Sequence, residues 1–277
     1  MSGIGTANSF DALLADAIHT VGLPGRVGPA AASAPASDAQ HWHVARASRN
    51  QAPRAMADWW ASRHPEAGRA YVALRCWGLL IWPAVYLSAA GLHRALGSPS
   101  LESFGLDIAE GMPTAFALSR HALHTGPVEA RLAFAADQLV RYCECARRAL
   151  DGIVRLNPVA ARGTLADCVL AAVLSVCARQ PFQTLPRIRE TGMHWLSVLQ
   201  LQGASDYIHY VGGDGIERLA LDRRVCCYHF RRHDGDFCST CPRLAPEQRL
   251  SRLRAEQAPY VNCPDCLATD TAISPNK

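Results

Sequence analysis

The residues PVEARLAFAADQLVRYCECARRALDG (127–152) carry the clearest helical pattern in the chain. Apolar or small side chains recur there at spacings of four, three, four and three, namely Leu132, Ala136, Leu139, Cys143 and Ala146. This spacing places them on one face of an α-helix. Pro127 suits a first helical turn, and Gly152 can end the helix in the left-handed conformation. The stretch therefore predicts an amphipathic helix packed against a core.

Helical patterns continue on both sides of this stretch. Asn157 and Pro158 combine a cap residue with a proline, which marks the start of a helix that ends before Pro181. Further helices are predicted over residues 56–63, 67–96 and 193–201. The chain shows no regular alternation of strands and helices. We predict a mainly α fold with minor β structure.

Composition divides the chain into three parts. Residues 1–40 combine a short helix with a segment rich in Pro, Gly, Ala and Ser, which is typical of a flexible linker. Residues 41–205 form the predicted helical body. Residues 206–277 have a different character, with a glycine-rich turn near residue 213 and many cysteines, and we predict that they form a cofactor-binding region.

The longest apolar stretch, residues 71–92, contains Arg75 and Pro83. A buried helix explains it better than a membrane span, which needs about 20 strongly apolar residues. The N-terminal residues lack the pattern of a secretory signal. We therefore expect a cytoplasmic protein, with peripheral association with the inner membrane left open. The net charge of +4 is too small to indicate nucleic-acid binding.

Cysteine is unevenly distributed along the chain. Of 11 cysteines, six lie in the last 52 residues, and the other five lie within apolar or helical patterns. Without an export signal, these cysteines are expected to be reduced thiols. The C-terminal concentration therefore points to metal binding.

The segment RRVCCYHFRRHDGDFCSTCPR (223–243) brings together two cysteine pairs. Cys226 and Cys227 are adjacent, and Cys238 and Cys241 follow as a C-x2-C pair. Four thiolates suit either a [2Fe–2S] cluster or zinc. Adjacent cysteines point to opposite faces of a strand, so both can bind one centre only where the backbone bends. Structural zinc sites use spaced pairs, so this pattern favours iron–sulfur.

The spacing C-C-x10-C-x2-C near the C-terminus of a mainly helical chain resembles the FhuF-like ferric-siderophore reductases. The resemblance covers this motif and the following Pro242, and beyond them only chain length and an aromatic-rich helical region. It implies that Cys226, Cys227, Cys238 and Cys241 hold a [2Fe–2S] cluster. It also implies that this cluster donates one electron to a siderophore-bound Fe(III).

A second pair, Cys263 and Cys266, supports a different interpretation. Together with Cys238 and Cys241 it gives C-x2-C-x21-C-x2-C, just beyond the usual spacing of a zinc ribbon. The chain would then be a zinc-binding interaction module without catalytic activity. A further alternative replaces a cysteine ligand by His229 or His233, as in Rieske centres.

The cysteine segment is rich in arginine. Residues 223–254 contain eight arginines and three acidic residues. We expect Arg231 and Arg232 to dock an anionic ferric siderophore or an acidic electron donor. The chain contains no G-x-G-x-x-G after a strand and no P-loop. Electrons should therefore come from outside, from a ferredoxin-like protein or a flavin reductase.

Overall fold

The computed structural model describes residues 5–28, 40–43, 51–95, 97–180 and 183–256. Its helices are α1 (Gly5–Val21), α2 (Ala52–Arg63), α3 (Gly68–His93), α4 (Val128–Leu150), α5 (Pro158–Cys177), α6 (Leu185–Val198) and α7 (Pro246–Ala255). The described residues also form short 3-10 helices, η2 (Pro65–Ala67) and η3 (His229–Arg231). The protein is 54% helical and 15% strand, which confirms the predicted mainly α fold with minor β structure.

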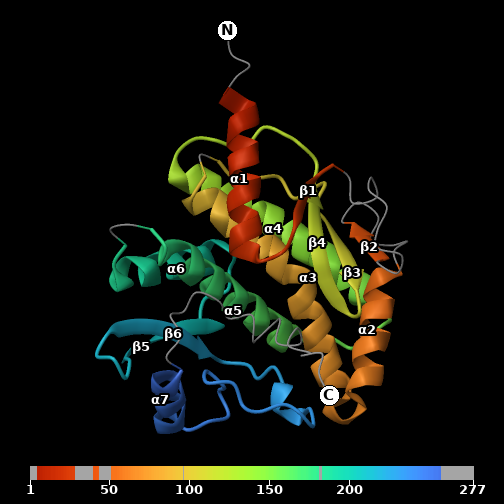
Figure 1. Cartoon of the computed structure of the whole chain (residues 1–277), viewed down its shortest axis with the longest axis vertical. Helices are drawn as coiled ribbons and strands as arrows, with labels where there is room; N and C mark the ends of the chain where they lie inside the picture. Colours follow the sequence, from red (N-terminus) through yellow and green to blue (C-terminus); the bar gives the residue numbers. More distant parts are fainter. Residues whose placement is uncertain (1–4, 29–39, 44–50, 96, 181–182, 257–277) are drawn as a thin grey trace, which may run out of the picture.

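Helix α3 forms the centre of the molecule, with α1, α2, α4 and α5 packed around it (Figure 1). Every residue from Tyr71 to Leu92 is buried, and the helix runs without a break through Pro83. A helix that is apolar all round must be covered on every side. The surrounding helices provide this cover, so α3 organises the core.

Among the residues that the structure describes, two helices are long and apolar enough to cross a membrane, by length and composition alone. They are the segment Pro65–His93, which contains α3, and α5. The most apolar part of the first is completely buried within the protein, and two thirds of that of α5 is buried. Core helices of globular proteins have the same properties, so this finding is weak evidence for a membrane span.

In the described part of the chain, two β-sheets accompany the helices. Strands β1 (Gly25–Val27), β4 (Met112–Leu118), β3 (Gly105–Ala109) and β2 (Gln40–His43) lie in that order in one sheet. Strands β5 (Ser205–Val211) and β6 (Glu217–Arg223) form an antiparallel hairpin. This hairpin contacts α5 and leads directly into the cysteine segment.

The predicted helices are confirmed, with shifts at their ends. Helix α5 is capped by Asn157, whose Oδ1 accepts from the N–H of Ala160 at 3.0 Å. Helix α6 was predicted to begin at residue 193 but begins at Leu185, because Thr184 and a following proline provide the same kind of start. Strands β1 to β5 were not predicted, and β1 lies in the segment expected to be a flexible linker, where it pairs with β4.

Side chains from all three predicted parts of the chain share one core. Phe10 and Leu13 of α1 lie in the same buried cluster as α3, and so do Tyr207 and Leu221 of the β5–β6 hairpin. The boundaries 1–40, 41–205 and 206–277 stay a prediction. The shared core means that α1 packs into the body rather than preceding it as an isolated helix.

Candidate metal centre

The chain bends sharply just after the adjacent cysteines. Strand β6 ends at Arg223, and η3 begins at His229. Between them Tyr228 adopts the left-handed conformation, with φ of 61°. This conformation is uncommon for a residue other than glycine. It supplies the bend that two neighbouring thiols need in order to face one centre.

The four cysteines of this segment come together. Cys226 Sγ lies 4.0 Å from Cys241 Sγ. Cys238 forms side-chain hydrogen bonds with both Cys227 and Cys241. Cys241 is buried, and the other three cysteines are partly exposed. The structure thus joins two cysteine pairs that are ten residues apart in sequence into one group of sulfurs.

Backbone N–H groups point at these sulfurs. The N–H of Tyr228 donates to Cys226 Sγ at 3.4 Å. Backbone hydrogen bonds also join His229 to Cys227 and Arg243 to Cys241. Hydrogen bonds to cysteine sulfur stabilise the negative charge of an iron–sulfur cluster and raise its potential. These donors fit a four-thiolate metal centre.

The thiols perturb one another because they are close together. The pKa of Cys227 is raised, mainly by its hydrogen bond with Cys238 and then by burial. The pKa of Cys241 is lowered, mainly by its hydrogen bond with Cys238. Several thiolates in one place repel each other unless a cation lies between them. The donor set therefore suits a centre of high positive charge such as a pair of ferric ions.

A buried ion pair contacts the group of cysteines through Cys238. Arg223 Nε donates to Asp167 Oδ2 at 2.8 Å, and Arg223 Nη1 donates to Cys238 Sγ at 3.5 Å. The hydroxyl of Ser205 donates to Asp167 Oδ1 at 2.6 Å. Burial raises the pKa of Asp167, and the charge of Arg223 opposes that shift. This network connects α5 of the body to the cysteine segment.

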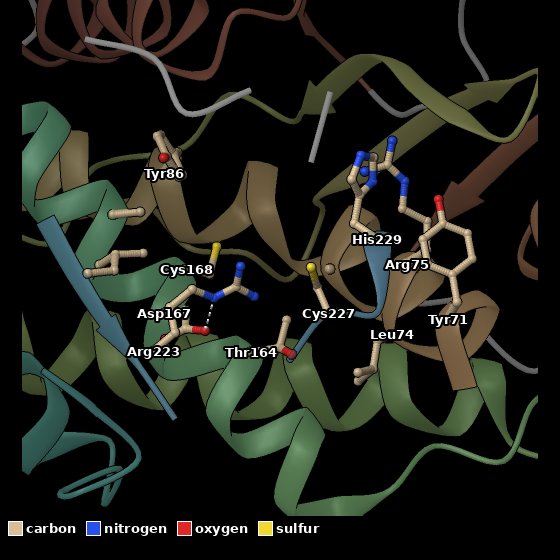
Figure 2. A pocket seen from close by; sticks show the side chains of 13 residues that line it. Tyr71, Leu74, Arg75, Tyr86, Thr164, Asp167, Cys168, Arg223, Cys227 and His229 are labelled. Atoms are coloured by element: carbon tan, nitrogen blue, oxygen red, sulfur yellow. Dashed lines mark hydrogen bonds and ion pairs between the residues drawn. The ribbon is translucent and has the colours of Figure 1, made fainter. Parts of the chain in front are cut away.

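A small cavity adjoins Cys227 (Figure 2). It lies between α3, α5 and the end of β6, and its lining includes Tyr71, Arg75, Arg223 and His229. Its volume is about 60 Å³. Pockets for small organic ligands are typically about 300–1,000 Å³. The cavity can hold a few water molecules but not an iron chelate.

More of the arginine charges in this region are neutralised by acidic side chains than the sequence suggests. Ion pairs join Arg223 to Asp167, Arg224 and Arg249 to Asp222, Arg232 to Asp234, and Arg252 to Asp236. Asp167 and Asp222 lie outside the arginine-rich stretch, so counting charges within that stretch overstated the local positive charge.

The prediction that Arg232 docks a ligand is wrong, because its side chain is only 3% exposed. Arg232 is bound to both carboxylate oxygens of Asp234, at 2.8 and 2.5 Å. Arg231 is exposed, and its guanidinium lies over the ring of Tyr228. Arg243 is likewise exposed and lies over the ring of Phe230. Arg243 therefore replaces Arg232 as a candidate for docking.

These features define a mainly α protein with a cysteine-rich metal centre at the end of a β-hairpin. Residues 223–243 match the family described as the FhuF 2Fe-2S C-terminal domain. This match supports an FhuF-like protein and indicates a [2Fe–2S] cluster. This finding favours iron–sulfur over the zinc alternative. Cys263 and Cys266, on which that alternative depends, lie outside the described residues.

Sequence patterns missed the residues that support the centre. Asp167 and Ser205 are 56 and 18 residues before Arg223, so only the fold shows that they meet it. A weak indication was present, because Asp167 is an acidic residue in a mainly apolar helix pattern. Buried acidic residues of this kind are nearly always paired.

Proposed function

We propose that this protein is a ferric-siderophore reductase, in which Cys226, Cys227, Cys238 and Cys241 hold the [2Fe–2S] cluster. One observation carries the proposal: the cysteines of the matched domain form a single group of sulfurs at a partly exposed site. A bound cluster supplies one electron, which reduces siderophore-bound Fe(III) to Fe(II) while the cluster is oxidised. Siderophore oxygens hold Fe(II) weakly, so this electron frees the iron.

The protein's own residues set the conditions for this transfer. The cysteine segment leaves Cys226, Cys227 and Cys238 partly exposed, so a substrate can approach the centre from outside. The neighbouring cavity is too small for the chelate. The substrate would therefore dock on the outer surface, where the electron has a short distance to travel.

Two arginines support the docking of an anionic chelate. Arg231 and Arg243 are exposed and stack on Tyr228 and Phe230, which lie beside the cysteines. Phe230 in turn stacks on Phe237, with ring centroids 4.6 Å apart. This stacking holds the two positive charges near the centre and leaves them in contact with solvent.

The electron must be replaced after each transfer. We propose an external donor, either a ferredoxin-like protein or a flavin reductase. The proposed compartment is the cytoplasm or the cytoplasmic face of the inner membrane. A reducing compartment suits a reaction that depends on cysteine thiolates and leaves iron as Fe(II).

Single-turnover reduction tests the proposal. The anaerobically reduced protein would be mixed with ferric hydroxamate and ferric catecholate siderophores in the presence of a colorimetric Fe(II) chelator. We expect the absorption of the oxidised cluster to return as Fe(II) is trapped, with one Fe(II) per cluster. Reduced protein that stays reduced in the presence of every ferric siderophore would contradict the proposal.

Charge-reversal variants of the protein test the docking step separately. Reversing the charge at both Arg231 and Arg243, as Arg231→Glu with Arg243→Glu, should slow reduction of anionic siderophores at low salt. The effect should shrink at high salt, because exposed charges are screened. Arg189→Glu is a control, since Arg189 is an exposed arginine on α6 that pairs with Asp206. Equal rates for all three proteins would remove these arginines from docking.

A further inference from the structure

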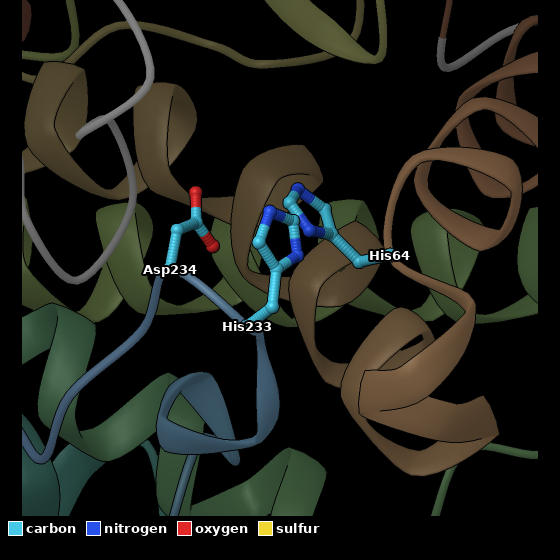
Figure 3. A group of neighbouring side chains, drawn as sticks. All are labelled: His64, His233 and Asp234. Atoms are coloured by element: carbon cyan, nitrogen blue, oxygen red, sulfur yellow. The ribbon is translucent and has the colours of Figure 1, made fainter.

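A second group of side chains that could bind a metal ion includes two residues of the cysteine segment. Potential ligand atoms of His64, His233 and Asp234 all lie within 4.8 Å of one another (Figure 3). His64 follows the end of α2, whereas His233 and Asp234 belong to the segment between Cys227 and Cys238. The fold therefore brings two distant parts of the chain together at this point.

The imidazole of His64 is held rigidly. Its ring is stacked on Trp60, with centroids 5.6 Å apart, and meets the ring of Tyr71 edge-on. The side chain is only 4% exposed. The ring of His233 lies 5.9 Å away from that of His64. Packing thus fixes one ligand before any metal binds.

Glu66 orients the second imidazole. Its Oε1 accepts from His233 Nδ1 and from the backbone N–H of His233, each at 3.0 Å. With the proton on Nδ1, the lone pair of His233 is on Nε2, which can then bind a metal. Metal-binding histidines commonly donate their other ring N–H to a carboxylate in this way.

Arg232 fixes the carboxylate of Asp234 by donating to both of its oxygens. An ionised carboxylate has about four lone-pair positions, so two remain for a metal. The exposed fractions are 47% for Asp234 and 71% for His233, in contrast to buried His64. The group is therefore anchored on one side and open to solvent on the other, which gives a metal ion a route of entry.

We propose that His64, His233 and Asp234 form a second metal site, which takes up Fe(II). Two imidazoles and one carboxylate with open positions are the ligand set typical of non-haem Fe(II). The choice of Fe(II) as the natural occupant rests on the proposed function, because Fe(II) is the product of that reaction. His233 and Asp234 lie within the cysteine segment, so released iron would be bound close to where it is reduced.

Isotopic labelling distinguishes this site from the cluster. The full chain would be loaded with a cluster of natural-abundance iron, given one equivalent of ⁵⁷Fe(II) anaerobically and passed through a desalting column. Mössbauer spectroscopy would then detect the added iron. We expect a retained high-spin Fe(II) signal with nitrogen and oxygen ligands. Loss of the added iron on the column, or its appearance only in the cluster signal, would overturn the proposal.

Three variants locate the retained iron. His233→Ala should weaken Fe(II) binding by at least about tenfold, and Glu66→Gln should weaken it by about 10–100-fold. The control is His209→Ala, because His209 is an exposed histidine that also pairs with a carboxylate, Glu217 at 3.4 Å. It should bind as the wild type does. Cluster absorption checks that each variant is folded.

Equal binding by His233→Ala and wild type, or equal loss in the His209→Ala control, would place the iron elsewhere and overturn the proposal. The outcome is separate from that of the reductase assay. A protein that reduces ferric siderophores but retains no ⁵⁷Fe(II) would keep the proposed function and lose the second site. A protein that retains ⁵⁷Fe(II) but reduces no ferric siderophore would keep the second site and lose the proposed function.

Discussion

The core around α3 and the segment from Cys226 to Cys241 are held in place by different interactions. Every residue from Tyr71 to Leu92 is buried among apolar neighbours. In the cysteine segment the described contacts are mainly turns and charged pairs, such as Arg232 with Asp234 and His233 with Glu66. A segment of this kind depends on its metal and on a few polar anchors, because metal binding contributes to folding where apolar burial is small.

The largest effect is expected at the anchor between the two regions. Arg223→Met leaves the buried carboxylate of Asp167 without its cation and removes a hydrogen bond to Cys238. Breaking a buried ion pair costs about 3–5 kcal/mol. We expect a lower melting temperature and loss of the cluster's visible absorption. Arg224→Met is the control, because Arg224 is exposed and pairs with Asp222. Equal behaviour of the two variants would show that the buried pair is not an anchor.

A substitution in the core around α3 should lower the stability of the protein without changing the iron content of the cysteine segment. Leu80→Ala in α3 removes a completely buried side chain. Such changes cost about 2–5 kcal/mol. Calorimetry should show a lower melting temperature, while the iron content per chain stays at the wild-type value below that temperature. Val140→Ala, on the exposed side of α4, should change neither quantity. Loss of iron from folded Leu80→Ala protein would show that metal binding by the cysteine segment depends on the packing around α3.

Acid should weaken the helical core through His93. Burial lowers the pKa of His93 to about 4, and its Nε2 accepts from Trp195 Nε1 at 2.8 Å. The neutral ring is therefore favoured in the folded state. Its contribution to stability is complete above about pH 6.5 and is lost as the pH falls toward 4, by up to about 3 kcal/mol.

His93→Gln keeps an acceptor but cannot be protonated, so its stability should depend less on pH between 6.5 and 4. Melting temperatures of the variant and the wild type across this range measure the difference. His209→Gln, an exposed control, should follow the wild type. If all three proteins show the same pH dependence, His93 is not the responsible group.

The smallest effect is expected at the rim of the cysteine segment. Arg252 donates to Asp236 at 3.0 Å and to the backbone oxygen of Phe237 at 2.5 Å, and both charged side chains are substantially exposed. Arg252→Gln should cost about 0.2–1 kcal/mol, because exposed pairs contribute little. The difference in melting temperature should shrink at high salt. A large loss that persists in high salt would show that this contact is a main anchor.

Local sequence signals were sufficient to predict the helices. Asn157 with Pro158 marks the start of α5, and the apolar spacing from Leu132 to Ala146 marks the buried face of α4. Strands β3 and β4 were missed because they are short and joined by a tight turn at Glu110 and Gly111, both of which have positive φ. Their burial comes from the helices packed on them, and no local pattern shows it.

Only part of the site could be predicted from the sequence. The spacing of the cysteines identified the group that the structure brings together. The role of Arg232 could not be predicted, because its burial depends on Trp60 and Tyr71, which are far away in sequence. The anchor formed by Arg223, Asp167 and Ser205 likewise exists only in three dimensions.

The central claim is that the four cysteines of residues 223–243 bind a [2Fe–2S] cluster. Iron, zinc and acid-labile sulfide should be measured in anaerobically purified wild type, in Cys227→Ser and in Cys145→Ser, whose cysteine lies on α4 away from the site. We predict two iron and two sulfide per chain in the wild type and in Cys145→Ser, and neither in Cys227→Ser. Zinc without sulfide in the wild type, or a cluster that survives in Cys227→Ser, would contradict the account.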